Sequence, residues 1–505
     1  MTVCWLVSLA VIIAIVAFCH FPRAADWHWL LPLDGFYHIP MMLSGTVAVA
    51  LTAFVCYKCC RTEEIDKLRL LVVSGVLTIV QILLVYSYYV HSDWDVQQVT
   101  GVAKAMAEGG TVEDYRGYFQ WTPNNLFLSR IVAAVFFLTG PLWGAKVTLF
   151  PLLALQCIGA GVTALMLTQT AMHIWRKKVY AIITYVLYTA LVWMSPWWSI
   201  PYSDIWGLMV AVTILWLATT LPFRRHWLKI FIVAAATAVG YYIRPQVVFV
   251  ALAMLFVLIL KAFCERRFPT SMHKKAGIAV AGIAAGVIMV HVAMIGCPLH
   301  LHTSKGFGPT HYLMMGANYQ SIGIYSAQDV DFSRSYPKKK ERARAEMRET
   351  VKRYSDLGVS GTLLLWGRKN LLNFSDGTFY WGREGIFYKE VPERSGVLAK
   401  VTRNIFYNRD GYGRYYVAWS VVVTSLFLGI IVFALFAALP LKRERLGMDD
   451  SSLFVVETVM VALLMLIAFH TLCEARSRYL FSFTPLFVIV AVEGIRRINL
   501  SFQAH

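Results

Sequence analysis

The sequence predicts an all-α polytopic membrane protein, on three observations. Of the 505 residues, 58% are apolar and 15% are charged, whereas soluble domains are about 45–50% apolar and about 25% charged. The mean hydropathy of the chain is +0.57. Apolar runs close to the roughly 20 residues that cross a bilayer as a helix recur throughout the sequence. A string of soluble domains, which this length would otherwise suggest, is therefore excluded.

Twelve apolar runs are long enough to be predicted as spans, so we expect a bundle of about 12 transmembrane helices. They lie near residues 2–19, 40–58, 70–91, 146–172, 179–196, 204–222, 228–243, 246–263, 276–296, 416–440, 452–470 and 478–495. The first run has neither a basic segment before it nor a convincing small-residue cleavage site. We expect it to remain as a span rather than to be removed as a signal peptide.

The net charge of +18 comes from 47 Lys and Arg against 29 Asp and Glu. Cytoplasmic loops of membrane proteins retain Lys and Arg, which explains this positive charge without a nucleic-acid partner. The basic clusters are Arg61, Lys67 and Arg69; Arg176, Lys177 and Lys178; Arg224, Arg225 and Lys229; Arg266, Arg267, Lys274 and Lys275; Lys442, Arg443 and Arg445; and Arg496 and Arg497. All six basic clusters lie on the cytoplasmic side of the membrane only if the N-terminus is cytoplasmic and residues 124–140 do not cross the membrane.

The stretch 124–140 therefore decides the topology. It has about 17 residues, follows Pro123 and contains Arg130. A short apolar helix with an internal arginine lies more favourably in the interface plane, where the guanidinium reaches the headgroups. We predict that this stretch is a juxtamembrane helix within one outer loop, residues 92–145.

This topology divides the chain into four regions. Residues 1–69 form two N-terminal transmembrane helices, and residues 70–296 form a transmembrane core that includes the outer loop. Residues 297–415 form a large loop domain on the outer face. Residues 416–505 form the C-terminal transmembrane helices.

Charged residues gather at the outer ends of the predicted spans rather than in their centres. They are Asp93, Asp95, Asp204, Arg244, Glu474, Arg476 and Arg478. Ion-coupled transporters place ionisable groups or broken helices near mid-depth, and this chain has no clear set of them. Loops at one face can converge, so we expect these side chains to form one site at the outer leaflet.

Each of these residues also has a plainer structural interpretation. Asp95 could cap a helix over 96–108, and Asp204 could cap the sixth span. Arg244 could be an interfacial anchor, and Glu474 could form an ordinary salt bridge with a nearby arginine. Together on one face, however, they predict a site with a carboxylate and several guanidinium groups.

That combination suits the transfer of a sugar from a polyprenyl phosphate. Guanidinium forks stabilise the negative charge that the leaving phosphate gains. Phosphate leaves without a proton, so a single base that accepts the acceptor's proton is enough, whereas glycosidases need two carboxyl groups. Asp95 is the candidate base, with Asp93 as the alternative.

Two segments of the first outer loop carry a resemblance to a known family. The run DVQQVTGVAKAMAEGG (95–110) and the run YFQWTPNNLFL (118–128) resemble this loop in glycosyltransferases of the GT-C superfamily. That superfamily includes protein O-mannosyltransferases and lipid A aminoarabinose transferases. Its pattern is matched by Asp95, Ala103, Met106, Gly109 and Pro123. The resemblance implies a GT-C type bundle with 70–296 as its catalytic core, and Asp95 as the catalytic acidic residue.

Two further segments resemble the same family. SPWWSIPYSDIWGLM (195–209) is similar around the second outer acidic position, here Asp204. RSRYLFSFTPLFVIVAVEG (476–494) is similar to the segment before the final span, which implies phosphate contact by Arg476 or Arg478. Many relatives have adjacent acidic residues in the first loop, whereas Trp94 separates Asp93 from Asp95 here, so the choice between the two acids stays open.

The loop domain and the C-terminal segment supply the remaining candidates. Stretches at 311–329 and 373–385 resemble uncharacterised bacterial relatives, and there Tyr380 and Trp381 either stack on a sugar or pack within the domain. Glu474 and Tyr479 are further candidates for acceptor or sugar contacts. His300, His302 and His311 lack ligand-like spacing, so we predict no metal site.

The sequence therefore predicts a GT-C type glycosyltransferase at the outer face of a bacterial cytoplasmic membrane. The donor is a polyprenyl-phosphate-linked sugar, and the acceptor is a hydroxyl of an envelope glycan, polymer or lipid. Arg244, Arg476 and Arg478 hold the phosphate, and Asp204 orients an arginine or the acceptor. No cofactor is indicated, and a divalent cation is left open. The alternatives are a transporter or flippase of lipid-linked sugars, and a glycan polymerase or ligase with a diphosphate-linked donor.

Overall fold

The structure, a computed structural model, describes residues 2–19, 38–60, 65–140, 148–220, 226–266, 272–301, 305–381, 390–408, 413–441 and 447–503. Within these ranges every regular element is a helix, and an isolated bridge between His91 and Glu390 is the one β pairing. The all-α prediction is confirmed.

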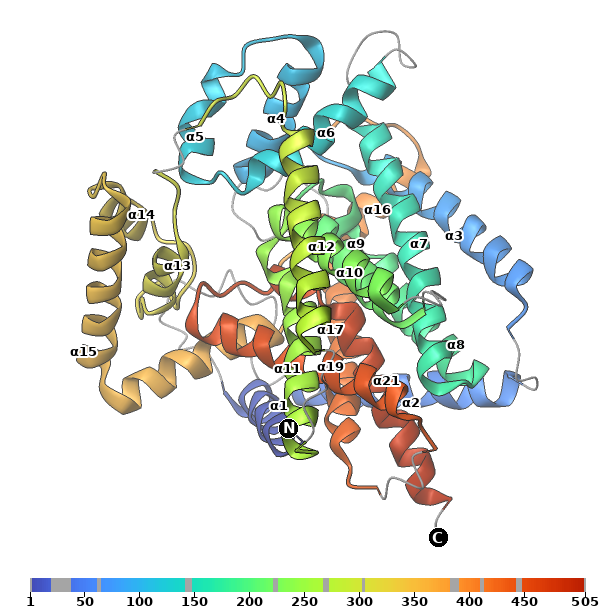
Figure 1. Cartoon of the computed structure of the whole chain (residues 1–505). Coiled ribbons are helices and arrows are strands. Elements are labelled where there is room, and N and C mark those ends of the chain that lie inside the picture. The colour runs from blue at the N-terminus through green and yellow to red at the C-terminus, as the bar shows by residue number, and fades with distance from the viewer. Residues whose placement is uncertain are drawn as a thin grey trace.

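The described helices follow one another along the chain (Figure 1). They are α1 (Thr2–Phe18), α2 (His38–Cys59), α3 (Lys67–Tyr88), α4 (Trp94–Glu108), η2 (Glu113–Tyr115), α5 (Arg116–Trp121), α6 (Asn125–Thr139), α7 (Phe150–Trp175), α8 (Lys178–Tyr188), η4 (Thr189–Trp193), η5 (Pro196–Ser199), α9 (Ser203–Thr220), α10 (His226–Ile243), η6 (Pro245–Val247), α11 (Val248–Cys264), α12 (Met272–Ala293), α13 (Pro309–Gly316), α14 (Ala327–Arg334), α15 (Lys339–Phe374), α16 (Val397–Phe406), α17 (Tyr416–Leu435), η7 (Phe436–Ala438), α19 (Asp450–Leu472), α20 (Arg478–Phe481) and α21 (Thr484–Phe502).

Nine helices among the described residues are long and apolar enough to span a membrane. They are α2, α3, α7, α9, α10, α11 with η6, α12, α17 with η7, and α19. The other three predicted spans differ in form. The run 2–19 is the 17-residue α1, and the run 179–196 is the short α8 continued by the π-helix η4. The run 478–495 is split into α20 and α21, and α21 carries three charged residues.

Small residues bring the helices of the bundle into close contact. Gly45 of α2 lies against α17, so that a Cβ at this position would overlap the Ser425 carbonyl oxygen. On α12, Gly282 and Gly286 meet the backbone of α10 in the same manner. Because lipid tails are as apolar as leucine, membrane helices associate through such backbone approach and packing.

Polar contacts tie the helices together at the end of the bundle near the C-terminus. Glu493, which is fully buried, accepts hydrogen bonds from Trp175, Arg496 and Arg497. At the same end, Lys261 of α11 lies 3.1 Å from Glu457 of α19. We call this the basic end. Several basic residues predicted for this side lie outside the described residues: Arg61, Arg224, Arg225, Arg267, Lys442, Arg443 and Arg445.

The opposite end of the bundle carries α4, α5 and α6 (Figure 1). The 15-residue α6 is shorter than a span, and its placement in the membrane interface stays a prediction. Its Arg130 donates to the Ala293 carbonyl oxygen at 3.3 Å and to the Ile295 carbonyl oxygen at 3.4 Å, and so caps the end of α12. The arginine that broke the apolar run therefore satisfies open helix carbonyls.

The loop region contributes a helical unit, residues 305–381, which lies beside the bundle with α13, α14 and α15 next to one another (Figure 1). Its interior is polar: Arg353 pairs with Asp329 at 2.6 Å, and Ser333 bridges His311 and Glu346 at 2.7 Å on each side. Helix α15 bends at Gly358, which has φ +61°. The second half of α15 turns toward the bundle, where it meets α1 and α19.

Candidate active site

The start of α4 places two acidic side chains in different roles. Asp93 is the N-cap, and its carboxylate accepts from the Trp94 N–H at 2.9 Å. The alternative that Asp95 caps this helix is therefore wrong, because the helix begins at Trp94 and the capping position falls on Asp93. Trp94 itself has φ +55°, a conformation that costs a non-glycine residue energy and is often found at functional sites.

Asp95 is held by two tyrosines from different parts of the chain. The Tyr202 hydroxyl donates to it at 2.8 Å, and Tyr118 also hydrogen-bonds it. Asn125 donates to the hydroxyl oxygens of both tyrosines, at 2.6 Å and 3.1 Å. Burial and then the Asp95 charge raise the pKa of Tyr118 and of Tyr202 well above the usual value. Both phenols therefore stay protonated and orient the carboxylate as donors.

Arg478 lies against the aromatic side chains that surround Asp95. Its guanidinium carbon is 4.1 Å from the Trp94 ring centre, 5.3 Å from that of Tyr479 and 5.5 Å from that of Tyr202. Such contacts are attractive, more so when the cation is desolvated, and Arg478 is only 5% exposed. Tyr202 therefore contacts both the candidate base and one of the predicted phosphate-binding residues.

Asp204 and Arg244 form a buried ion pair. Asp204 Oδ1 lies 2.7 Å from Arg244 Nη1, with side chains 2% and 4% exposed. Arg244 also donates to Ser203 Oγ at 3.3 Å, and its guanidinium lies 5.1 Å from the Tyr479 ring centre. Neither plainer interpretation fits, because Arg244 does not reach solvent as an anchor and the Asp204 carboxylate faces an arginine rather than a helix N-terminus.

Glu474 is a second carboxyl group of the same site. It lies 3.9 Å from Arg476 Nε, and Tyr479 hydrogen-bonds it. Burial raises the pKa of Glu474 above its usual value, although the charges of Arg476 and Arg478 act in the opposite direction. The Asp95 charge contributes to the same increase, which means that the two carboxyl groups are within electrostatic range of each other.

Tyr312 of the 305–381 unit lies within electrostatic range of the site. Burial raises its pKa, and the charges of Glu474 and Asp95 add to this increase. Sequence reasoning missed this residue, as well as Trp94, Tyr118, Asn125 and Tyr202. Trp94 and Tyr202 stand within two residues of predicted acids, which was an available signal. Nothing in the sequence distinguishes Tyr312 from other tyrosines of the loop region.

Tyr380 and Trp381 are enclosed by protein, which favours packing within the fold over contact with a sugar. They are 2% and 0% exposed. The Tyr380 hydroxyl donates to the Leu372 carbonyl oxygen at 3.1 Å, and the Trp381 indole donates to the Phe406 carbonyl oxygen at 2.7 Å. Their rings pack between helices, which is the alternative that the sequence left open.

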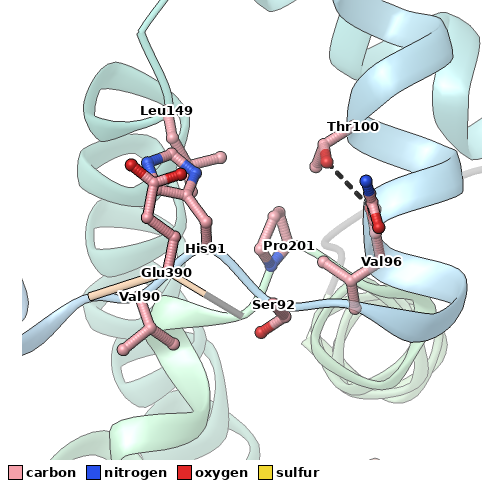
Figure 2. Close-up of a pocket in the computed structure, with 9 residues that line it drawn as sticks. Val90, His91, Ser92, Val96, Thr100, Leu149, Pro201 and Glu390 are labelled. Carbon is pink, nitrogen blue, oxygen red and sulfur yellow. Dashed lines mark hydrogen bonds between the residues drawn. The ribbon is translucent and has the colours of Figure 1, made fainter. Parts of the chain in front are cut away.

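A cavity of about 200 Å³ lies beside the N-terminal part of α4 (Figure 2). Its lining residues are Val90, His91, Ser92, Val96, Gln97, Thr100, Leu149, Pro201 and Glu390. Pro201 and Val96 are the immediate chain neighbours of Tyr202 and Asp95, so the cavity borders the segments that carry the candidate base. It is smaller than the roughly 300–1,000 Å³ of typical ligand pockets.

The described residues contain no group of three or more His, Cys, Asp and Glu arranged to hold a metal ion. Of the histidines considered above, His311 bonds to Ser333, and His302 lies outside the described residues. The absence of a metal in the mechanism remains a prediction.

These contacts combine an oriented carboxylate with guanidinium groups held over aromatic rings, at one end of a helical bundle. Such a set can accept a proton and stabilise an anion in one place. Asp95 and Arg478 both contact Tyr202, and Arg478 also lies over the Trp94 ring, whereas Asp93 is the N-cap of α4.

The fold defines a multi-pass integral membrane protein with a carboxylate and guanidinium cluster at one end of its bundle. The chain belongs to the family described as "Conserved hypothetical integral membrane protein", whose profile matches residues 37–497. No curated protein matches the chain. Among solved structures, ArnT from Cupriavidus metallidurans bound to undecaprenyl phosphate is similar at 13% identity, over 85% of this chain and 77% of that chain, with a TM-score of 0.32. A similarity at that TM-score does not establish a shared fold.

Proposed function

We propose that this protein is a glycosyltransferase of GT-C type that moves a sugar from a polyprenyl phosphate to a hydroxyl group of an envelope glycan, polymer or lipid. One observation carries the proposal. The carboxylate of Asp95 and the guanidinium of Arg478 meet on the same side chain, Tyr202. A base for the acceptor and a cation for the leaving phosphate are the two groups that this reaction needs.

The reaction is a single displacement. Asp95 takes the proton of the acceptor hydroxyl, and the oxygen forms a bond to the anomeric carbon. The bond from that carbon to the phosphate oxygen breaks, and its electron pair stays on the phosphate. Arg478 and Arg476 stabilise the added charge, together with Arg244, which also lies against the Tyr479 ring. One displacement inverts the configuration at the anomeric carbon.

The two carboxyl groups other than Asp95 take supporting roles. Asp204 keeps Arg244 in place through the buried ion pair. Glu474, together with Tyr479, contacts the acceptor or the sugar. Burial raises the pKa of Glu474, and its carboxyl oxygens lie beside Arg476, where they can accept a hydrogen bond from a sugar or acceptor hydroxyl. The basic end faces the cytoplasm by the positive-inside rule, so the site faces outward from a bacterial cytoplasmic membrane.

The test uses purified protein with a radiolabelled undecaprenyl-phosphate sugar and an envelope extract as the source of acceptors. We expect wild-type protein to transfer label and release undecaprenyl phosphate, and Asp95→Asn to lose at least about 100-fold of that rate, since general-base catalysis contributes roughly 10²–10⁴-fold. Asp93→Asn is the matched control, because asparagine also caps helices well and this variant should retain most activity.

The outcomes separate the rival functions. Undiminished transfer by Asp95→Asn would remove Asp95 from its role. A diphosphate-linked donor that is used in preference to the monophosphate would indicate a polymerase or ligase. Movement of the labelled lipid across liposomes without any transfer would indicate a flippase.

A further inference from the structure

Lys369 is a lysine completely enclosed by protein, at 0% exposure, near the end of α15. Its amino group donates to the Gly316 carbonyl oxygen at 2.9 Å and to the Cys473 carbonyl oxygen at 2.6 Å. Burying such a group is unfavourable unless its donors are satisfied. The second carbonyl belongs to the segment 473–478, which carries Glu474, Arg476 and Arg478.

The last two turns of α15 hold this segment at two further points. Before it, Asn370 donates to Thr471 Oγ1 at 3.1 Å. At its far side, the Ser477 hydroxyl donates to the Asn373 carbonyl oxygen at 3.0 Å, and the Asp376 carbonyl oxygen just beyond α15 lies 3.3 Å away. The Lys369 contact at Cys473 therefore falls between the contacts at Thr471 and Ser477.

The turn at Gly323 completes the enclosure from the other side. Its carbonyl oxygen accepts from the Ala475 N–H at 2.9 Å. Gly323 has φ +70°, and a Cβ there would lie 2.8 Å from Lys369 Cε. Only glycine suits both the backbone conformation and the passing lysine side chain.

We propose that Lys369 is a positioning residue for the lipid-phosphate site, which orders the segment 473–478 so that Arg476 and Arg478 face a polyprenyl phosphate. The identity of the anion rests on the proposed function. The ordering of the segment does not rest on the proposed function, because hydrogen exchange measures it without a ligand.

The charge of Lys369 gives this role a pH dependence. Burial lowers the pKa of Lys369 to about 7, against smaller opposing effects of Cys473 and Glu474. The other titratable group facing it is His470 in the last turn of α19, whereas α13 and the Gly323 turn present a backbone carbonyl and a glycine. Lys369 is therefore charged below about pH 7 and neutral above it. The positive potential around the segment declines across that pH range.

The first measurement is hydrogen exchange of the full-length protein, which needs no ligand. In Lys369→Met, we expect faster exchange in residues 473–478 than in wild type, with exchange in α7 and α9 unchanged. Lys352→Met is the matched control on the same helix, because Lys352 is exposed. Unchanged exchange at 473–478 in folded Lys369→Met would overturn the proposal.

The second measurement is the affinity for undecaprenyl phosphate in nanodiscs, with undecaprenol as the uncharged comparison. We expect Lys369→Met to bind the phosphate about tenfold more weakly at pH 6, as the loss of one charge-assisted interaction predicts. The difference from wild type should narrow by pH 8, where Lys369 is neutral. A purely structural lysine would give a difference that does not change with pH.

Two variants make the result independent of one substitution. Lys369→Arg keeps a positive charge at every pH, so it should restore part of the affinity and show no narrowing. Gly323→Ala should reproduce the faster exchange of 473–478, since its methyl group displaces the lysine. If wild-type protein fails to bind undecaprenyl phosphate while the exchange results hold, the positioning role stands and the proposed function fails.

Discussion

At the scale of single residues, Tyr202 connects the acidic and basic parts of the candidate site. Its hydroxyl donates to Asp95, and its ring faces both Arg478 and Trp94, with the Trp94 ring centre 5.0 Å away. Trp94 has its left-handed backbone where Asp93 caps the helix, and its indole lies against Tyr202 and Arg478. Strain of this kind persists only where the surroundings determine the conformation.

Removing the Tyr202 hydroxyl should therefore affect catalysis more than folding. We expect Tyr202→Phe to lower kcat about tenfold with little change in KM, because the hydrogen bond to a carboxylate contributes about 1.5–3 kcal/mol. The labelled-donor assay measures this. Tyr185→Phe is the control, since it also removes a buried hydroxyl contact, to Ser74 at 3.0 Å, in α8. Equal losses of kcat in the two variants would contradict the role of Tyr202.

At the scale of helices, the contact between α2 and α17 depends on two glycines that face each other. Gly45 lies on the Ser425 carbonyl and on Gly429, and a Cβ on either glycine would overlap the other helix. The Trp5 indole of α1 donates to the Ala434 carbonyl oxygen of α17 at 2.8 Å and so extends the same assembly. The N-terminal helices are thus packed on the C-terminal ones.

Gly45→Ala should weaken this contact, because α2 and α17 must separate to admit the methyl group. Overpacking of this kind costs about 1–3 kcal/mol, and we expect a lower unfolding free energy in denaturing-detergent titrations. Gly75→Ala in α3 is the matched control, since no atom lies within 4 Å of its Cβ position. There the substitution should be neutral or stabilising, by helix propensity. Equal stability of the two variants would show that the α2 and α17 backbones do not meet.

At the scale of the whole molecule, the sequence predicted the helical class and the location of the charged residues, because hydropathy and charge act locally along the chain. It could not predict how distant segments meet. The ion pair of Asp204 and Arg244 joins residues 40 positions apart, and Tyr312 of a separate helical unit comes within electrostatic range of Glu474 and Asp95. The burial of Tyr380 and Trp381 was also decided by packing partners, such as Phe406, that no local pattern identifies.

The burial of Lys369 also depends on contacts between distant segments that the sequence could not predict. A lysine in the apolar second half of α15 was a visible irregularity, but its meaning depends on the carbonyl groups of Gly316 and Cys473. Sequence patterns therefore indicate which residues are candidates for the site, whereas the contacts that orient these residues are seen only in the folded structure.

The two ends of the bundle lead to a prediction about orientation. Arg496 and Arg497 mark the basic end, near which the C-terminus lies (Figure 1). At the other end, α16 meets the last turn of α3, where Thr402 and Ser87 are 2.9 Å apart, and α3 ends six residues before α4 begins. Because Lys and Arg are retained on the cytoplasmic side, the site should face outward.

Full-length protein with a C-terminal fluorescent protein should fluoresce in bacterial cells, whereas a C-terminal alkaline phosphatase should be inactive. Lys400→Cys, on an exposed position of α16, should add labelling by a membrane-impermeant maleimide in intact cells, relative to the wild-type chain with its own cysteines. Active phosphatase, or Lys400→Cys labelling that appears only after permeabilisation, would place the Asp95 site in the cytoplasm. A lipid-linked donor presented at the outer leaflet could not then reach it, so the orientation bears directly on the proposed reaction.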